Sequence, residues 1–455
     1  MTVLSQIGYS GLQAAHTALT VAGQNIANVN TPGFNRLALD THSVAGHGRL
    51  SGGGGVEVTG IRRIVNDFNN QQLWRATTDA KYHETRQTYL TALESLVDSD
   101  GSSISIGLDN LFAALSEATT APDSIALRQQ ILNDAEELTQ RFNGLNGNIQ
   151  SQINAVHGQR QSMVNEINGI SNNIAELNDR IIQLEASGRD TASLRDHRDA
   201  LIKDLSELVD IRPLERADGA IDVALANGQP LVSGRRASEI EVVQTGAGEQ
   251  QLVLSFAGTD FALNQQRLGG SLGALYDVEY GSLRPAQDEL HDMAGAIAEL
   301  FNDTITQGFD LEGNAGQELF VYNPASTTGM LTLNPLRPEE LALSSEPDEV
   351  GNSDILSQLI EIRHATIEVA GSNVPVNDAY AGLVGRVAST SRQNQADLEA
   401  AKSVQNSAQA QRDQVSAVNL DEEAINLMTY TQAYQANMRV ISTSNELFAS
   451  LLTMF

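Results

Sequence analysis

Apolar residues recur at every seventh position near the beginning of this 455-residue chain. The heptad positions are Leu12, Leu19 and Ile26, and each is followed three residues later by Ala15, Ala22 and Val29. A repeat of this length is typical of a helix that buries one stripe against a partner. It predicts a helix over residues 4–29, which ends at Thr31-Pro32-Gly33 because a residue before proline avoids helical backbone angles.

The C-terminal end repeats this pattern over a longer stretch. The heptad positions are Leu420, Leu427, Tyr434, Ile441, Phe448 and Phe455. The positions four residues further along are Ala424, Thr431, Met438, Asn445 and Leu452. The stripe predicts a helix over residues 418–455 that is roughly 57 Å long. Its first turn carries three acids, which the positive end of a helix dipole favours.

Between the two ends, the apolar period is first helical and then alternating. One long helical stripe consists of Phe142, Ile149, Val156, Met163, Ile170, Leu177 and Leu184. Further helices are predicted over residues 283–300 and 377–416. Apolar residues alternate with polar or small ones at Ile221, Val223 and Leu225, at Ile240 and Val242, at Leu252, Leu254 and Phe256, and at Leu331 and Leu333. Alternation of this kind predicts antiparallel strands with one buried face.

These patterns predict a mainly α fold with an inserted antiparallel β domain. The molecule is expected to be elongated, its domains discontinuous, and its terminal helices joined in a coiled-coil-like pair. Residues 1–50 and 417–455 are assigned to the terminal-helix domain. Residues 51–210, 270–310 and 350–416 are assigned to a helical bundle body. Residues 211–269 and 311–349 are assigned to one antiparallel β outer domain.

The charge is distributed unevenly along the chain. The net charge is −29, yet residues 1–35 contain no charged side chain and residues 424–455 contain only Arg439 and Glu446. This acidity argues against binding to nucleic acid or to an anionic membrane surface. No run of apolar residues is long enough to insert into a membrane, and the N-terminus does not resemble a secretory signal. There is no cysteine, which excludes disulfides and thiolate sites.

The sequence offers no recognisable site for chemistry. Its histidines are scattered, and none lies in a metalloprotease or Cys/His motif. The Gly-rich run Ser51–Gly55 lacks the Lys-Ser/Thr ending of a phosphate loop and is interpreted as a connector. Residues 310–314 resemble a calcium loop only superficially, because glycine and the bidentate acid are misplaced. No catalytic, cofactor-binding or metal residue is therefore predicted.

Two motifs near the ends resemble the flagellar axial proteins, the family of rod, hook and hook-associated proteins. The N-terminal motif is Ser10-Gly11-Leu12-Gln13-Ala14-Ala15 followed by Asn25-Ile26-Ala27-Asn28-Val29-Asn30-Thr31-Pro32-Gly33-Phe34. The C-terminal motif is Val418-Asn419-Leu420-Asp421-Glu422-Glu423 followed by Gln432-Ala433-Tyr434-Gln435-Ala436-Asn437. Internal segments, among them Leu194-Arg195-Asp196-His197-Arg198-Asp199, resemble the hook-associated members. The motif residues carried over are Asn28, Asn30, Thr31, Pro32, Gly33, Phe34, Asn419, Asp421 and Glu422.

The resemblance implies a structural protein without enzymatic activity or cofactors, at the junction between flagellar hook and filament. Its expected location is the extracellular flagellum, and the cytoplasm before unfolded export. Its expected partners are copies of itself in a ring, the hook protein on one side and the second hook–filament junction protein on the other. The type III export apparatus and an export chaperone are further expected partners. No nucleic acid or membrane is expected among them.

The expected assembly interface is the apolar stripe of the two terminal helices. It comprises Leu12, Leu19, Ile26, Leu420, Leu427, Tyr434, Met438, Ile441, Phe448 and Leu452. Two helices side by side cover only one face of each, so nearly charge-free helices require further neighbours. Two alternatives remain open. One is a non-flagellar extracellular coiled-coil surface protein or adhesin, and the other is an enzyme with its site in the β insert.

Overall fold

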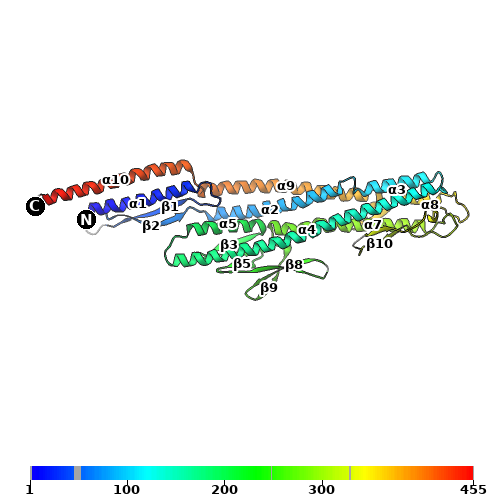
Figure 1. Ribbon diagram of the computed structural model, residues 1–455, viewed down its shortest axis with the longest axis horizontal. Helices are drawn as coiled ribbons and strands as arrows, with labels where there is room; N and C mark the ends of the chain where they lie inside the picture. Colours follow the sequence, from blue (N-terminus) through cyan, green and yellow to red (C-terminus); the bar gives the residue numbers. More distant parts are fainter. Residues whose placement is uncertain (1–2, 46–52, 247, 327–328, 454–455) are drawn as a thin grey trace.

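The computed structural model describes residues 3–45, 53–246, 248–326 and 329–453. It is an elongated molecule whose long helices run along one axis and whose termini lie at the same end (Figure 1). The helices are α1 (Val3–Ala27), α2 (Asp67–Val97), α3 (Ile104–Ala118), α4 (Ile125–Ala186), α5 (Ala192–Leu208), α6 (Gly270–Val278), α7 (Arg284–Ile305), α8 (Asp354–Glu361), α9 (Val376–Ser416) and α10 (Leu420–Thr453). The predicted fold class is confirmed. Residues 46–52 and Phe455, in the predicted connector and C-terminal stripe, lie outside the described residues.

Short antiparallel sheets decorate this helical frame. The strands are β1 (Leu37–Val44), β2 (Gly55–Arg63), β3 (Ile211–Glu215), β4 (Ile221–Leu225), β5 (Pro230–Ser233), β6 (Arg236–Ala237), β7 (Glu239–Gln244), β8 (Gln250–Phe256), β9 (Thr259–Ala262), β10 (Phe320–Tyr322), β11 (Leu331–Leu333), β12 (Thr366–Val369) and β13 (Ser372–Pro375). Strands β3–β6 form one sheet and β7–β9 a second, while β1–β2, β10–β11 and β12–β13 are hairpins.

The molecule divides into two parts with different interiors. The end unit comprises α1, the β1–β2 hairpin and α10, and the body comprises residues 67–416. Helix α4 runs through the body for 62 residues, and its stripe at Phe142, Ile149 and Val156 is completely buried. The body thereby contains one continuous apolar core that α4 shares with α3, α5, α6 and α7.

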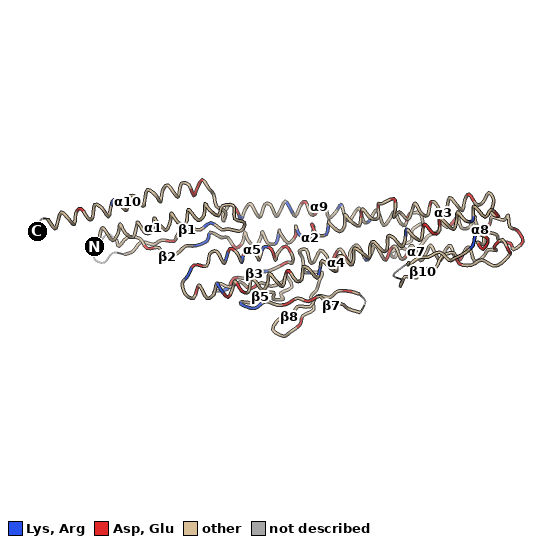
Figure 2. The backbone as a smooth tube through the Cα atoms, in the orientation of Figure 1, with Lys and Arg blue, Asp and Glu red and all other residues tan. Residues whose placement is uncertain are grey.

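Charge follows the same division. Residues 1–66 and 417–455 contain five arginines and six acids, so −28 of the total −29 belongs to residues 67–416. Figure 2 shows charged residues along the body and few of them on α1 and α10. The body can carry this charge because its acids are spread over a solvated surface.

Asparagine side chains on helices hold the outer strands. The Asn178 amide donates to Ile221 O over 2.8 Å and accepts from Ile221 N over 3.0 Å. Asn168 pairs in the same way with Ile240, at 2.8 and 2.9 Å. Each amide satisfies both backbone groups of one strand residue, which would otherwise be costly to leave unpaired against a helix. Asn143 and Asn302 repeat the arrangement at Leu331 and Phe320.

The predicted domain boundaries need two corrections. Residues 55–63 were assigned to the helical body, but β2 pairs with β1 and packs on α1, so they belong to the end unit. Residues 311–349 were joined to residues 211–269 in one β domain. Strands β10 and β11 instead pair only with each other and pack on α4 and α7, far from β8 in Figure 1. The asparagine contacts of α4 and α7 explain this separate docking.

A buried carboxylate sits where the helix from α6 to α7 is distorted. Glu279 begins a π-helical turn, Glu279–Leu283, and is completely buried. It accepts hydrogen bonds from Arg160 over 2.7 Å, His157 over 2.9 Å and Arg284 over 2.7 Å. Burial opposes its ionisation, but these hydrogen bonds outweigh burial and lower the pKa of Glu279. The Glu279 cluster (Glu279, His157, Arg160 and Arg284) therefore joins α4 to α7 through charge.

Candidate assembly interface

Helices α1 and α10 pack closely, with small side chains on the α1 side. A Cβ atom on Gly8 would lie 2.9 Å from the Ile441 side chain, and one on Gly11 would lie 2.5 Å from Asn437 Oδ1. Ala15, Ala18 and Ala22 continue the buried face of α1. On α10 the fully buried residues are Glu423 and Ser444, and the half-buried Tyr434, Asn437, Val440 and Ile441 complete a pairing face that is partly polar and partly apolar. The two backbones approach closely because little side-chain bulk stands between them.

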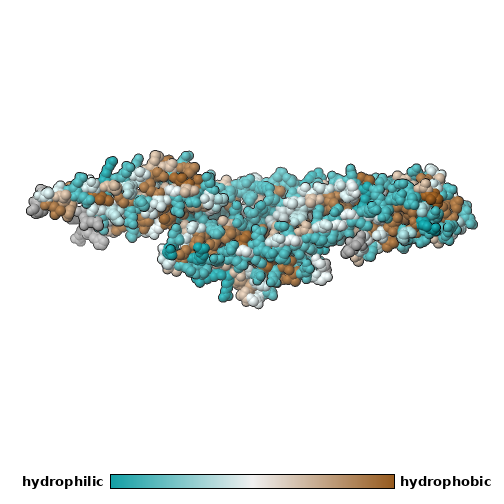
Figure 3. Space-filling view, in the orientation of Figure 1, coloured by the Kyte–Doolittle hydropathy of each residue, from teal (hydrophilic) through white to brown (hydrophobic). Residues whose placement is uncertain are grey.

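The opposite side of α1 is covered by the hairpin. Buried Val21 packs in a small cluster with Leu37 of β1 and Ala192 of α5, and Phe34 and Ile61 lie against it. Helix α1 is therefore enclosed from two sides, whereas α10 has a partner on one side only. Figure 3 shows apolar side chains on the surface of the end unit along α10.

Half of the predicted interface residues lie on the uncovered face. Leu420 is 50% exposed, Met438 52%, Phe448 52% and Leu452 64%. Leu427 is also exposed, while Leu12, Leu19, Ile26, Tyr434 and Ile441 are half-buried. The structure brings together Tyr434 and His16, whose ring centroids are 6.5 Å apart. The heptad stripe of α10 therefore overlaps the face that binds α1 at Tyr434 and Ile441, and the other predicted interface residues of α10 are exposed.

A group of hydrogen bonds ties the base of α1 to the start of α10. The buried Asn25 amide donates to Leu37 O over 2.9 Å and to Glu423 Oε1 over 3.2 Å, and accepts from Leu37 N over 2.9 Å. Beside it, Arg36 forms an ion pair with Glu422 at 2.6 Å. Arg36 N also donates to Ser416 O over 2.8 Å. These contacts join residues 25–37 to residues 416–423.

The motif residues of the N-terminal half form the loop after α1. Asn28, Thr31, Pro32, Gly33 and Phe34 line a 440 Å³ cavity against α5. Gly33 has a φ of +80°, which favours glycine. Asn30 is exposed. In the C-terminal motif, Asn419 caps α10 by accepting from Asp421 N over 3.0 Å, while Asp421 itself is exposed.

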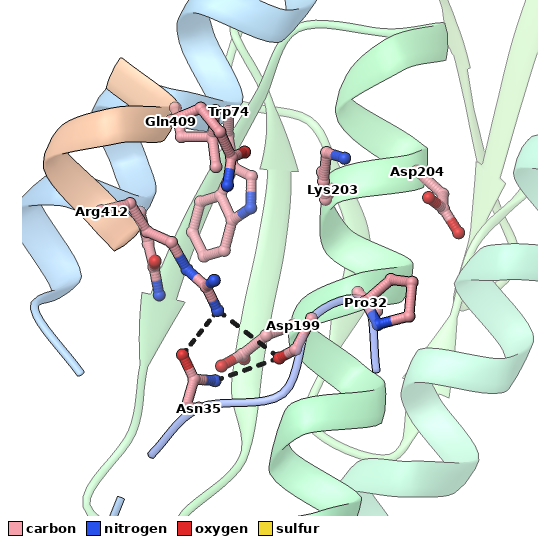
Figure 4. A pocket seen from close by; sticks show the side chains of 12 residues that line it. Pro32, Asn35, Trp74, Asp199, Lys203, Asp204, Gln409 and Arg412 are labelled. Atoms are coloured by element: carbon pink, nitrogen blue, oxygen red, sulfur yellow. Dashed lines mark hydrogen bonds between the residues drawn. The ribbon is translucent and has the colours of Figure 1, made fainter. Parts of the chain in front are cut away.

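The joint between end unit and body is polar. Asn35 donates to Asp196 Oδ1 over 2.5 Å, and Arg63 forms ion pairs with Asp196 at 3.0 Å and Asp199 at 2.7 Å. Arg412 of α9 donates to Asn35 Oδ1 over 2.6 Å (Figure 4). Burial raises the pKa of Asp196, and the Arg63 charge opposes this shift. Four distant segments of the chain therefore converge in one buried network.

A second cavity of 260 Å³ lies on the other side of this joint. Trp74, Lys203, Gln409 and Arg412 line it together with Pro32 (Figure 4). Trp74 is 8% exposed and belongs to the body core. The joint thus has cavities on both flanks and rests on polar contacts rather than on an apolar core.

Neither a membrane helix nor a metal-binding cluster is found in the described ranges. Within residues 3–45, 53–246, 248–326 and 329–453, no helix combines the length and apolarity needed to cross a bilayer. Over the same ranges, no three acids or histidines lie where they could hold a metal ion together.

Several residues of the interface and joint were not predicted. Asn25, Asn35 and Glu423 are buried polar groups, and Arg63, Asp196 and Asp199 pair across the joint. Asn25 and Glu423 stand inside the two terminal motifs, so the motifs contained a signal for them. The pairing of Arg63 with Asp196 had no such signal, because 133 residues separate the two in sequence.

The geometry defines a class of protein: an elongated, mainly helical subunit with a self-contained body and an end unit that leaves large apolar side chains exposed. Comparisons with known proteins agree. Residues 90–320 match the flagellar hook-associated protein FlgK helical domain. Residues 6–35 match the flagella basal body rod protein model, and residues 409–454 match the C-terminal model of the flagellar basal body rod FlgEFG proteins.

Individual relatives cover nearly the whole chain. Flagellar hook-associated protein 1 of Salmonella typhimurium is 27% identical over 99% of this chain and 100% of its own length. The Bacillus subtilis protein of that name is 23% identical over 97% and 96%. The flagellar hook junction protein FlgK from Burkholderia pseudomallei has a similar structure, with a TM-score of 0.52 and 26% identity over 56% of this chain and 47% of that one.

The chain belongs to the family of flagellar hook-associated proteins that share the FlgK helical domain, since this domain model matches half of it. Membership gives it a structural role in the flagellum, an extracellular appendage, at the hook–filament junction. The family is one of structural flagellar proteins rather than enzymes. The alternative of a non-flagellar surface coiled coil is not favoured.

Proposed function

We propose that this chain is exported unfolded and assembles at the hook–filament junction through the uncovered face of its end unit. The observation that supports this is the row of large apolar side chains on α10, with Leu447, Phe448, Leu451 and Leu452 each more than half exposed. A contiguous exposed apolar surface of this kind marks a protein–protein contact. Leu420, Leu427 and Met438 extend the row toward the joint.

Copies of the same chain are the partners that fit this face. Because α1 covers only one side of α10, a single helix pair leaves five stripe residues exposed, namely Leu420, Leu427, Met438, Phe448 and Leu452. Identical neighbours in a ring would cover the stripe of each copy with the next and form a tube of terminal helices. Heptad spacing suits such helix-to-helix contacts. The body, with its net charge of −28, would remain outside the tube in contact with water.

The neighbours above and below the ring would be other flagellar components. We assign the hook protein to one side and the second hook–filament junction protein to the other. Export through the type III apparatus before assembly suits a chain without cysteine, because no disulfide can lock it. In the cytoplasm, an export chaperone would shield the apolar stripe of α10. No enzymatic activity is part of this role.

Charging the stripe tests the proposal. Leu427→Asp introduces a carboxylate on the exposed stripe, and Thr429→Asp introduces the same group two residues away on the exposed surface outside it. The Leu427 variant is expected to leave hooks without filaments and to release filament protein into the medium. The Thr429 variant is expected to grow filaments, and both purified chains to retain the thermal unfolding of the body. Normal filaments in the Leu427 variant would overturn the proposal.

A further inference from the structure

We infer that one turn of α5 fixes the direction of the end unit on the body, with its acidic side holding the end unit and its basic side anchored in the body. The turn consists of Arg195, Asp196, Arg198 and Asp199. Residues three apart on a helix point to the same side, so the two acids share one side and the two arginines share another. The direction of the end unit can be tested without the proposed function; only its consequence for the position of the α10 stripe in a ring rests on that function.

The acidic side faces the end unit. Asp196 accepts from Asn35 Nδ2 over 2.5 Å and pairs with Arg63 at 3.0 Å, while Asp199 pairs with Arg63 at 2.7 Å. These are not surface ion pairs. Asn35 is 1% exposed and Asp196 is 9% exposed. Arg63 is the last residue of β2, so its guanidinium ties the hairpin directly to α5.

The basic side of the same turn faces the body. Arg195 bridges Glu185 and Glu215, each at 2.6 Å, and thereby joins the end of α4 to β3. Arg198 is 1% exposed and donates to Asn178 Oδ1 over 3.1 Å and to Gly219 O over 2.7 Å. The turn is therefore anchored to α4 and to the β3–β6 sheet while it holds the end unit.

Polar contacts set the angle here because apolar packing is sparse. Cavities of 260 and 440 Å³ flank the joint, and the apolar contact across it is limited to a small cluster around Leu37 and Ala192. Buried charges favour one geometry strongly, since a displaced partner leaves a charge without compensation. A joint held this way has one preferred direction without a large interface. In the assembled ring, that direction would determine where the α10 stripe meets its neighbours.

Paired spin labels can measure the direction in the full chain, which has no native cysteine. One pair, Gln432→Cys and Gln395→Cys, spans the joint between α10 and α9. The second pair, Gln395→Cys and Asn165→Cys, lies within the body and serves as a reference. All three positions are exposed. The inference predicts a narrow distance distribution for both pairs in the otherwise unchanged protein.

Substitutions that remove one charge from α5 provide the test. Asp196→Asn and Asp199→Asn are expected to broaden or shift the joint distance and to leave the body distance unchanged. Arg195→Gln is expected to act in the same direction but more weakly, because Arg198 remains. Asp204→Asn, exposed on the same helix, is the matched control and is expected to change neither distance.

Three results would overturn the inference. They are a broad joint distance in the unchanged protein, a joint distance that stays narrow in both aspartate variants, and a joint distance unaffected by Arg195→Gln. Leu427→Asp, which tests the proposed function, is expected to leave the joint distance as it was. If Leu427→Asp blocks assembly while the distance distribution across the joint stays narrow, the defect lies in the stripe and not in the joint. If Asp196→Asn broadens the distance distribution across the joint, the effect lies in the α5 turn and not in the stripe.

Discussion

The long helices α4 and α10 carry the same heptad signal and use it in opposite ways. In α4 the stripe residues Phe142, Ile149 and Val156 are completely buried in a core that the chain supplies for itself. In α10 the stripe residues Leu420 and Met438 are half exposed, while α1 contacts Tyr434 and Ile441 of the same stripe. An apolar repeat thus shows that a helix needs a partner, but not whether the partner is in the same chain.

The body and the end unit also differ in charge. The body carries −28 and is stable in water through its own core, whereas the end unit carries −1 and leaves apolar surface uncovered. The end unit is expected to unfold first in denaturant, since it buries few large side chains. Trp74, the single tryptophan, is buried in the body core and also lines the 260 Å³ cavity at the joint, so its fluorescence follows the unfolding of the body and of its contact with residues 32–35.

The largest expected effect is on the body. Glu279→Gln removes the only carboxylate of the Glu279 cluster and leaves Arg160 and Arg284 without its charge. It is expected to lower the free energy of unfolding of the body by about 3–5 kcal/mol. Denaturant unfolding followed by Trp74 fluorescence measures this loss. The same change at exposed Glu241 is the control, and an equal effect at both positions would contradict the account.

Two asparagine substitutions compare the parts directly. Asn178→Ala and Asn25→Ala each leave the N–H and C=O of one strand residue without their partner, at a cost of about 1–3 kcal/mol. Asn178→Ala is expected to shift the tryptophan-detected transition of the body. Asn25→Ala is expected to shift only the unfolding of the end unit, which occurs at lower denaturant and is measured as a loss of helical circular dichroism. If Asn25→Ala shifted the tryptophan transition equally, the two parts would not unfold separately.

Glycines in α1 sharpen the description of the helix pair. A methyl group on Gly8 would meet Ile441 at 2.9 Å, while nothing lies within 4 Å of the same atom on Gly23. Gly23→Ala is therefore expected to stabilise the end unit by about 1 kcal/mol through helix propensity. Gly8→Ala is expected to gain the same helix propensity but to lose that stabilisation again, because its methyl group would be too close to Ile441. Thermal unfolding of the end unit compares the two, and equal stabilisation would mean that α1 and α10 do not pack closely at Gly8.

The smallest expected effects concern pH and have opposite signs at the joint and in the body. Burial raises the pKa of Asp196 above 3.8, so its favourable contribution exists below 3.8 and is lost as the pH rises through its folded value. The pKa of Glu279 lies below 4.5, so its contribution exists above 4.5 and is lost on acidification. A tenfold difference between the folded and unfolded acid dissociation constants changes the free energy of unfolding by about 1.4 kcal/mol.

Substitutions separate these two contributions. Glu279→Gln is expected to reduce the acid-dependent loss of body stability below pH 4.5. Asp196→Asn is expected to reduce the loss of unfolding free energy that accompanies deprotonation of Asp196 above pH 3.8. Unfolding curves recorded across this range compare the slopes. Slopes that match the unchanged protein in both variants would contradict the assignment.

Sequence patterns predicted five of the ten α-helices in the described residues, namely α1, α4, α7, α9 and α10, and predicted the contacts between helices less well. Periodicity identified α1, α4 and α10 because a stripe of apolar residues is visible without knowing its partner. It could not identify the whole face of α10 that binds α1, since that face combines Tyr434 and Ile441 of the stripe with the polar residues Glu423, Asn437 and Ser444. The β1–β2 hairpin was missed because its strands are weakly alternating and its glycine-rich connection was interpreted only as a connector.

The joint could not be predicted for a different physical reason. Its polar and charged groups come from Asn35, Arg63, Asp196, Asp199 and Arg412, which are distant in sequence and acquire meaning only when folded together. Asp196 and Asp199 stand in the internal segment that resembles the hook-associated proteins, but the resemblance does not indicate which residues they contact. The motif loop 28–34 was found through family resemblance, and its contact with α5 required the structure.

The most direct test of the account asks whether the stripe of α10 becomes covered on assembly. Met438→Cys provides a single thiol on the exposed stripe, and Thr259→Cys on β9 provides an exposed reference on the body. Both are expected to react rapidly with a maleimide in the free chain. In assembled flagella, the Met438 position is expected to lose its reactivity while the Thr259 position keeps it. Undiminished labelling of position 438 in flagella would contradict the central claim that this face binds neighbouring subunits.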